Sequence, residues 1–222
     1  MPLRSPSLSR LLALALASLA ISCGAPPPPE APPAPPAPSA PRPPSELRDA
    51  ASFTSIAEPS ERSRALFLEA SRVMLHARCV NCHPTDDIPR QREAHELHNP
   101  PVLRGDDDKG IPGLRCISCH QETNLELARV PGTPDWHLAP KSMPWLGKAP
   151  GTICNQIKDP KRNGGKTLAQ IVDHAAHDKL VAWGWAPGSG REPAPGNQER
   201  FAGLMAAWVE TGAACPPEEA SR

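Results

Sequence analysis

Two copies of one pentapeptide constrain this chain more than any other feature of its sequence. Residues 79–83 read CVNCH and residues 116–120 read CISCH, so the spacing Cys-x-x-Cys-His occurs twice. On a helical turn, positions i, i+3 and i+4 project from nearly one face. Two thiols at i and i+3 can therefore form thioethers with the two vinyl groups of one porphyrin, and the histidine at i+4 lies beneath the iron. The sequence predicts two covalently bound haem c groups.

The attachment residues and proximal iron ligands follow directly from the two motifs. They are Cys79, Cys82, Cys116 and Cys119 for the thioethers, and His83 and His120 for the iron atoms. Zinc is one alternative, because two Cys-x-x-Cys pairs could form a four-thiolate site. That alternative leaves both following histidines without a role. A thioredoxin-like redox pair would accompany a βαβ pattern, and the sequence shows none.

The first 44 residues read as a leader followed by a tether. Residues 1–22 combine a basic start, a short apolar stretch and a small-residue cleavage site, as an export signal does. Cys23 follows at once, and the stretch LAIS before it resembles the lipobox of bacterial lipoproteins, although Ala20 stands where leucine is commonest. An ordinary signal peptide cut at the same bond is the alternative. Residues 23–44 would then be an acylated cysteine and a proline-rich, extended tether.

These features favour a periplasmic protein that a lipid anchor holds to a bacterial membrane, the outer membrane rather than the inner one. Residues 45–217 form the expected folded domain, and residues 218–222 form a short tail. The chain has 24 Lys and Arg against 24 Asp and Glu, and this balance argues against nucleic acid as a partner.

Apolar residues at helical spacing indicate the fold class. They predict helices over residues 61–78, 114–119, 167–177 and 197–212. Thr167 with Gln170 is an expected capping box, and Asn197 is an expected N-cap. Long loops separate the helices, and aromatic residues are few, with five Trp, three Phe and no Tyr. We expect a mainly α, di-haem cytochrome c-like domain with few helices and long loops, in which two porphyrins supply much of the apolar interior.

The cysteine count is consistent with this assignment. Of seven cysteines, four bind haem and Cys23 takes lipid, which leaves Cys154 and Cys215 to pair as a disulfide. The alternative is that Cys154 is a distal haem ligand.

Each iron also needs a sixth ligand or a vacancy. His98 lies in a loop before the second motif and is free to reach an iron, and His177 ends the third expected helix beside His174. We predict His98 and His177 as the distal ligands. His137 and Met143 stay open as alternatives, and a surface position is the alternative for each histidine.

Stretches well beyond the motifs resemble a known family. They include PPVLRG, PGLRCISCH, WHLAPKSM, ICNQIKDPKRNGG, HDKLVAWGWAPGSGREPAPG and AAWVETGAACP. Over residues 75–216 the chain is similar to small bacterial di-haem cytochromes that carry the label of isoquinoline 1-oxidoreductase subunit. Pro144 departs from the smaller residue expected there. The resemblance implies an electron acceptor for the catalytic subunit of a molybdenum hydroxylase, with a downstream electron acceptor as second partner.

The chemistry of such a partner fits two haems. Hydroxylation with water releases two electrons, and each haem can hold one. The sequence has no nicotinamide or flavin fingerprint and no molybdenum site, so it favours an electron relay over an enzyme. The main alternative is a di-haem enzyme such as a peroxidase or thiosulfate oxidase, which needs one haem with an open or easily displaced distal position. A haem-based sensor or a structural lipoprotein is a third.

Overall fold

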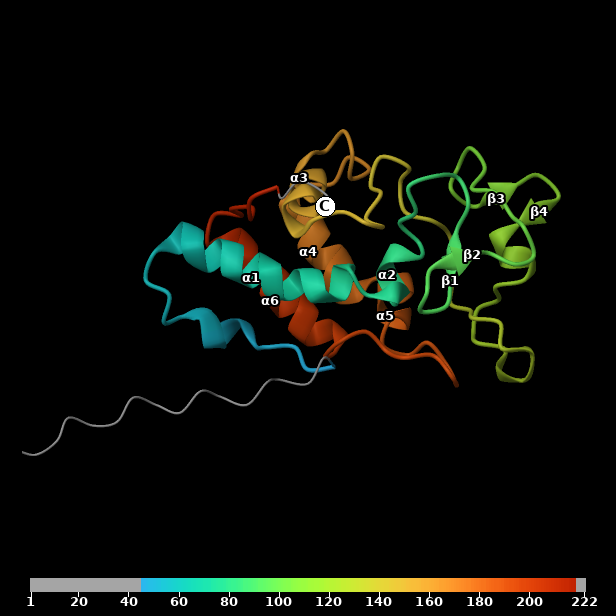
Figure 1. Cartoon of the computed structure of the whole chain (residues 1–222), viewed down its shortest axis with the longest axis horizontal. Coiled ribbons are helices and arrows are strands. Elements are labelled where there is room, and N and C mark those ends of the chain that lie inside the picture. Colours follow the sequence, from blue (N-terminus) through green and yellow to red (C-terminus); the bar gives the residue numbers. More distant parts are fainter. Residues whose placement is uncertain (1–44, 219–222) are drawn as a thin grey trace, which may run out of the picture. The chain divides into compact units, whose positions relative to one another are not determined.

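The computed structural model describes residues 45–218, so the expected export signal, Cys23, the whole tether and residues 219–222 of the tail lie outside the described residues. Within this range most of the regular secondary structure is helical, which agrees with the mainly α class that the sequence predicts. Helices α1, α3, α4 and α6 lie together in Figure 1, and α2 and α5 lie between them and two small hairpins. None of the helices in residues 45–218 is both long and apolar enough to cross a membrane.

The core forms where three helices meet. Helix α6 (Gln198–Glu210) contacts both α1 (Pro59–Met74) and α4 (Leu168–His177). Phe67 of α1 packs against Trp208 of α6 with ring centroids 5.1 Å apart, and both side chains are fully buried. Burying an apolar side chain of this size contributes roughly 1.5–3 kcal/mol, so this contact is a main source of stability.

Side-chain caps fix the starts of these helices. The Glu58 carboxylate accepts the backbone N–H groups of Ser60 and Glu61 at the start of α1. The expected capping box between Thr167 and Gln170 is present at the start of α4. The Asn197 side chain accepts the N–H of Arg200 at the start of α6. The capping box of Thr167 with Gln170 and the N-cap at Asn197 were predicted from the sequence, and both are confirmed.

The helix expected over residues 61–78 is two helices in the structure. Helix α1 ends at Met74, and α2 (Ala77–Val80) begins after an extended residue, His76, with φ −73° and ψ 150°. The His76 side chain accepts the N–H of Arg78 and so caps α2. This cap turns the chain and gives the first haem motif a helix of its own.

The second motif also differs from the expected helix. The chain reaches it through a hairpin of β3 (Gly110–Ile111) and β4 (Leu114–Arg115), and Cys116–Ser118 then forms a single 3₁₀ turn. The other hairpin pairs β1 (Arg90–Gln91) with β2 (Glu96–Leu97).

The remaining elements connect these parts. Two further 3₁₀ turns cover Ala50–Phe53 and Glu126–Ala128, and the remaining helices are α3 (Pro150–Lys158) and α5 (Lys179–Trp183). Cys154 of α3 forms a disulfide with Cys215, which follows α6, and their Cα atoms are 5.6 Å apart. This is the pair that the cysteine count predicts.

Candidate haem-binding sites

The first motif holds its histidine in a fixed orientation. His83 Nδ1 lies 2.9 Å from the backbone carbonyl of Met143, which can only accept a hydrogen bond. Nδ1 therefore carries the proton, and Nε2 is the nitrogen left for a metal. The imidazole also stacks on Trp145, with ring centroids 3.4 Å apart and an interplanar angle of 7°. A carbonyl behind an imidazole is the usual arrangement for a histidine that binds metal.

A cavity adjoins this motif. Cys79, Cys82 and His83 line it together with apolar side chains from four helices. These side chains are Val73 and Met74 of α1, Ile171 and Ala175 of α4, Val181 and Trp183 of α5, and Phe201 and Met205 of α6. Two thiols, one imidazole and a largely apolar wall are the groups that a covalently attached haem requires. The residues present therefore fit the group that the motif predicts.

Burial sets the protonation of these groups. It raises the pKa of the Cys79 thiol to about 12. It raises the pKa of Cys82 to about 11, with a further contribution from the neighbouring Cys116 of the second motif. Burial lowers the pKa of His83 to about 3 against the opposing effect of the Met143 carbonyl. His83 is therefore a neutral imidazole at pH 7, the form that binds iron.

The second motif repeats this arrangement on irregular backbone. His120 Nδ1 lies 2.8 Å from the carbonyl of Pro131, and its ring stacks on Trp136 with centroids 4.5 Å apart and an interplanar angle of 3°. Gly132 allows the loop to approach, because a Cβ there would lie 2.3 Å from the carbonyl oxygen of Thr123. Burial lowers the pKa of His120, so it too is held neutral.

The structure brings the predicted ligand His98 to the second motif. The ring centroids of His98 and His120 are 5.9 Å apart. His98 Nδ1 lies 2.8 Å from the carbonyl of Pro100, so its Nε2 is also left free. Two metal–imidazole bonds of about 2 Å, added to the distance from each nitrogen to its ring centre, separate the rings of a ligand pair by roughly 6 Å. The observed spacing fits such a pair.

The structure does not bring His177 to the first motif. The His177 side chain is 75% exposed, bonds to Asp173 and is not among the residues that line the cavity. His174, on the same helix, does line it, and so do the two open alternatives, His137 and Met143. The sequence contained a signal for His174, because it lies three residues after Ile171 on the apolar stripe of this helix.

Two tryptophans connect the sites. Trp136, which stacks on His120, meets Trp183 edge to face, with ring centroids 4.9 Å apart and an interplanar angle of 81°. Trp183 lines the cavity beside the first motif. The Asn124 side chain accepts hydrogen bonds from both the indole N–H of Trp183 and the backbone N–H of Gly132. The loop that holds His120 is thereby fastened to the helix that closes the first cavity.

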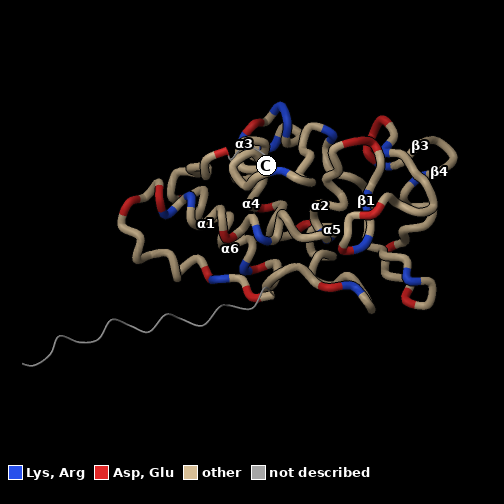
Figure 2. Tube along the Cα trace, in the orientation of Figure 1, with Lys and Arg blue, Asp and Glu red and all other residues tan. Residues whose placement is uncertain are grey.

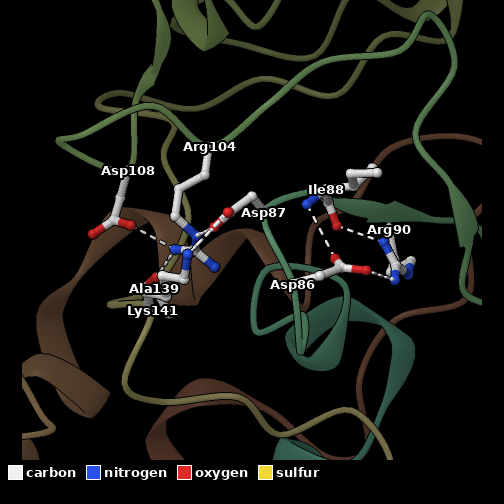
Figure 3. A network of polar contacts seen from close by, with 8 residues as sticks. All are labelled: Asp86, Asp87, Ile88, Arg90, Arg104, Asp108, Ala139 and Lys141. Atoms are coloured by element: carbon white, nitrogen blue, oxygen red, sulfur yellow. Dashed lines mark hydrogen bonds and ion pairs between the residues drawn. The ribbon is translucent and has the colours of Figure 1, made fainter.

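A buried arginine joins the two motifs on another side (Figure 3). The Arg104 guanidinium donates to Asp108 and to the carbonyl of Ala139, and it lies 3.6 Å from a carboxylate oxygen of Asp87. Ala139 in turn donates its N–H to the carbonyl of Cys82, and the Arg104 carbonyl accepts the N–H of Gly110 in β3. Arg104 therefore connects the first motif with the hairpin that leads into the second.

Among residues 45–218, no cluster of three or more Cys, His, Asp or Glu side chains could hold a metal ion, so the two cysteine pairs are not assembled into one four-thiolate site.

Comparisons with protein-family models, curated proteins and solved structures find no match to the chain.

Proposed function

We propose that the protein is an electron-transfer cytochrome with two covalently bound haem c groups, attached at Cys79 and Cys82 and at Cys116 and Cys119. The observation that carries the proposal is the repeated environment of the two motif histidines. Each has its Nδ1 at a backbone carbonyl, each stacks on a tryptophan, and each keeps Nε2 free. Surface histidines have no need of such support.

The residues have separate tasks in this function. A bound haem supplies an iron that gains and loses one electron. The motif cysteines hold the porphyrin, and His83 and His120 bind the iron as neutral imidazoles. The two carbonyls fix the tautomer of these rings, and Trp145 and Trp136 keep the rings from turning. Fixed ligands suit electron transfer because little has to reorganise when the charge on the iron changes.

The proximity of the two motifs supports a relay rather than two independent sites. Cys116 lies near enough to Cys82 to raise its pKa, and Trp136 contacts Trp183 of the first cavity. Two one-electron sites in contact suit a donor that releases two electrons at once. The proposed donor is the catalytic subunit of a molybdenum hydroxylase, on the resemblance to isoquinoline 1-oxidoreductase subunits, and a second protein takes the electrons onward.

The partners would be recognised on a surface of mixed charge. Figure 2 shows Lys and Arg interspersed with Asp and Glu over the described residues. Such a surface does not favour a polyanion such as nucleic acid. The proposed location is the periplasm, at the outer membrane, with the lipid on Cys23. The disulfide between Cys154 and Cys215 fits an oxidising compartment.

The proposal is tested by expressing the exported chain together with a haem-maturation system. We expect the mass of two haems per chain and the ferrous spectrum of thioether-linked porphyrin. Cys82→Ser and Cys119→Ser should each lose the stable attachment of one haem. Recovery of zinc without iron would disprove the proposal. Turnover of peroxide or thiosulfate by the purified protein would instead support a di-haem enzyme.

A further inference from the structure

We propose that His174 is the second axial ligand of the haem attached at Cys79 and Cys82, and that the Asp178 carboxylate behind its ring lowers the reduction potential of that haem. This inference depends on the proposed function, because it needs a haem at the first motif. It replaces His177, which the sequence predicts, by a histidine one helical turn earlier.

His174 lies at the cavity beside the first motif. His174 and His83 line the same cavity, and α4 holds His174 on its wall between Ile171 and Ala175, which line it too. The His174 side chain is 43% exposed, so it stands at the mouth of the cavity. His137 also lines this cavity, but it lies in a loop, where its Nδ1 is at the backbone carbonyl of Asp135. Of the histidines around the cavity, His174 is therefore the best placed to share an iron with His83.

A carboxylate, that of Asp178, lies behind the His174 ring. Its Nδ1 lies 3.3 Å from Asp178 Oδ2, which leaves Nε2 for the iron. The other oxygen, Asp178 Oδ1, accepts the N–H groups of Leu180 and Val181 at the start of α5, which fixes the carboxylate in this position. An aspartate carboxylate is ordinarily an anion at neutral pH, and a carboxylate that accepts the second N–H of a histidine ligand makes that ligand more basic.

The group that faces Nδ1 distinguishes His174 from the other candidate ligands. His83, His98 and His120 each have Nδ1 at a neutral backbone carbonyl. His174 differs from them, because its partner is charged. A more basic ligand donates more electron density and favours the ferric iron, so the first haem should have a lower potential with Asp178 than without it.

The same helix supplies a matched control. His177 and Asp173 form a pair with the same i, i+4 spacing, and their atoms are 2.8 Å apart. Both of these side chains are about three-quarters exposed and neither lines the cavity. A change that acts only through helix stability or surface charge should affect the two pairs equally. A change that acts through the iron should affect only His174 and Asp178.

The experiment starts from the mature protein with both haems attached, as shown by its mass. Carbon monoxide is added to the fully reduced protein, because it binds ferrous haem only at an open axial position. We expect no binding to the unsubstituted protein, one CO per chain after His174→Ala, and none after His177→Ala. Added imidazole should restore the original spectrum of the His174→Ala protein, which a merely structural defect would not allow.

A redox titration tests the role of the carboxylate. Asp178→Asn keeps Oδ1, which accepts the N–H groups of Leu180 and Val181 at the start of α5. Loss of a carboxylate behind a histidine ligand changes metal binding by about tenfold or more, and a tenfold change in the preference for ferric over ferrous iron is about 59 mV. We expect one haem to shift upward by this amount, the other to stay in place, and Asp173→Asn to shift neither.

Several results would overturn the inference while leaving the proposed function intact. One is CO binding by the unsubstituted protein that His174→Ala does not increase, which would mean that His174 closes no axial position. Another is a new CO site after His177→Ala or His137→Ala but not after His174→Ala. Equal potentials for the Asp178→Asn and Asp173→Asn proteins would remove the role of the carboxylate. A chain that binds no haem at all would instead disprove the proposed function itself.

Discussion

At the scale of single residues, the buried side chain of Arg104 connects the loops around the two motifs. The Arg104 side chain is only 4% exposed, yet its contacts come from three separate stretches of chain (Figure 3). They lie at Asp87, Asp108 and Ala139, and Lys141 pairs with the same Asp87. Such a network holds loops that have little regular secondary structure of their own.

Replacement of Arg104 should therefore be costly. Arg104→Met removes its hydrogen bonds and leaves the Ala139 carbonyl without that donor, which should lower the free energy of unfolding by about 1–3 kcal/mol. Arg92→Met is the control, because the Arg92 side chain is 70% exposed and pairs at the surface with Glu96. Its effect should stay within about 0.5 kcal/mol. Urea unfolding of both proteins measures the difference, and equal effects would mean that the network stabilises nothing.

At the scale of elements, the disulfide joins helices whose packing is otherwise noncovalent. It links α3 to the segment after α6 across 61 residues of sequence. That interval contains α4 and α5, which line the first cavity. The cross-link therefore limits how far Cys154 and Cys215, and the chain between them, can spread in the unfolded state.

Removal of the disulfide should act on stability and not on the haems. In the chain-entropy account, a loop of this length is worth about 4 kcal/mol. Cys154→Ala/Cys215→Ala should lower the free energy of unfolding by that order, and Cys154→Ala alone should cost nearly as much, since either change breaks the cross-link. Denaturant unfolding gives the comparison. A changed haem spectrum in the folded double variant would instead connect Cys154 to an iron, the alternative left open by the sequence.

The elements also show which structural features can be predicted from the sequence and which cannot. It predicted the caps at Thr167 and Asn197 because capping needs only neighbouring residues. It missed the break at His76, which depends on one extended residue, and both hairpins, whose strands are two residues long and carry no alternating pattern. It put His98 in a loop beside the second motif, and the structure has His98 next to His120. It could not decide between His174 and His177 for the first cavity, because the face of α4 that meets the cavity is set by packing against α6.

At the scale of the whole molecule, the two proposed haem sites differ in how much protein core surrounds them. The core of α1, α4 and α6 is built from the protein's own side chains, among them Leu66, Phe67, Leu204 and Trp208, all at most 1% exposed. Between residues 85 and 131, by contrast, only Arg104 and Gly110 are buried. The expectation that porphyrins supply much of the interior therefore applies to the second site more than to the helical part.

This difference predicts two levels of stability in a chain that carries no haem. Local stability follows buried apolar contacts, so residues 90–131 should exchange their amide hydrogens rapidly without haem, while α1 and α6 stay protected. Hydrogen exchange followed by mass spectrometry compares the haem-free full chain with the chain that carries both haems. Cys116→Ala/Cys119→Ala is the intermediate case, and its loss of protection should be confined to residues 90–131. Rapid exchange throughout α1 and α6 in the haem-free chain would show that the helical core, too, depends on haem, as the scarcity of aromatic residues first suggests.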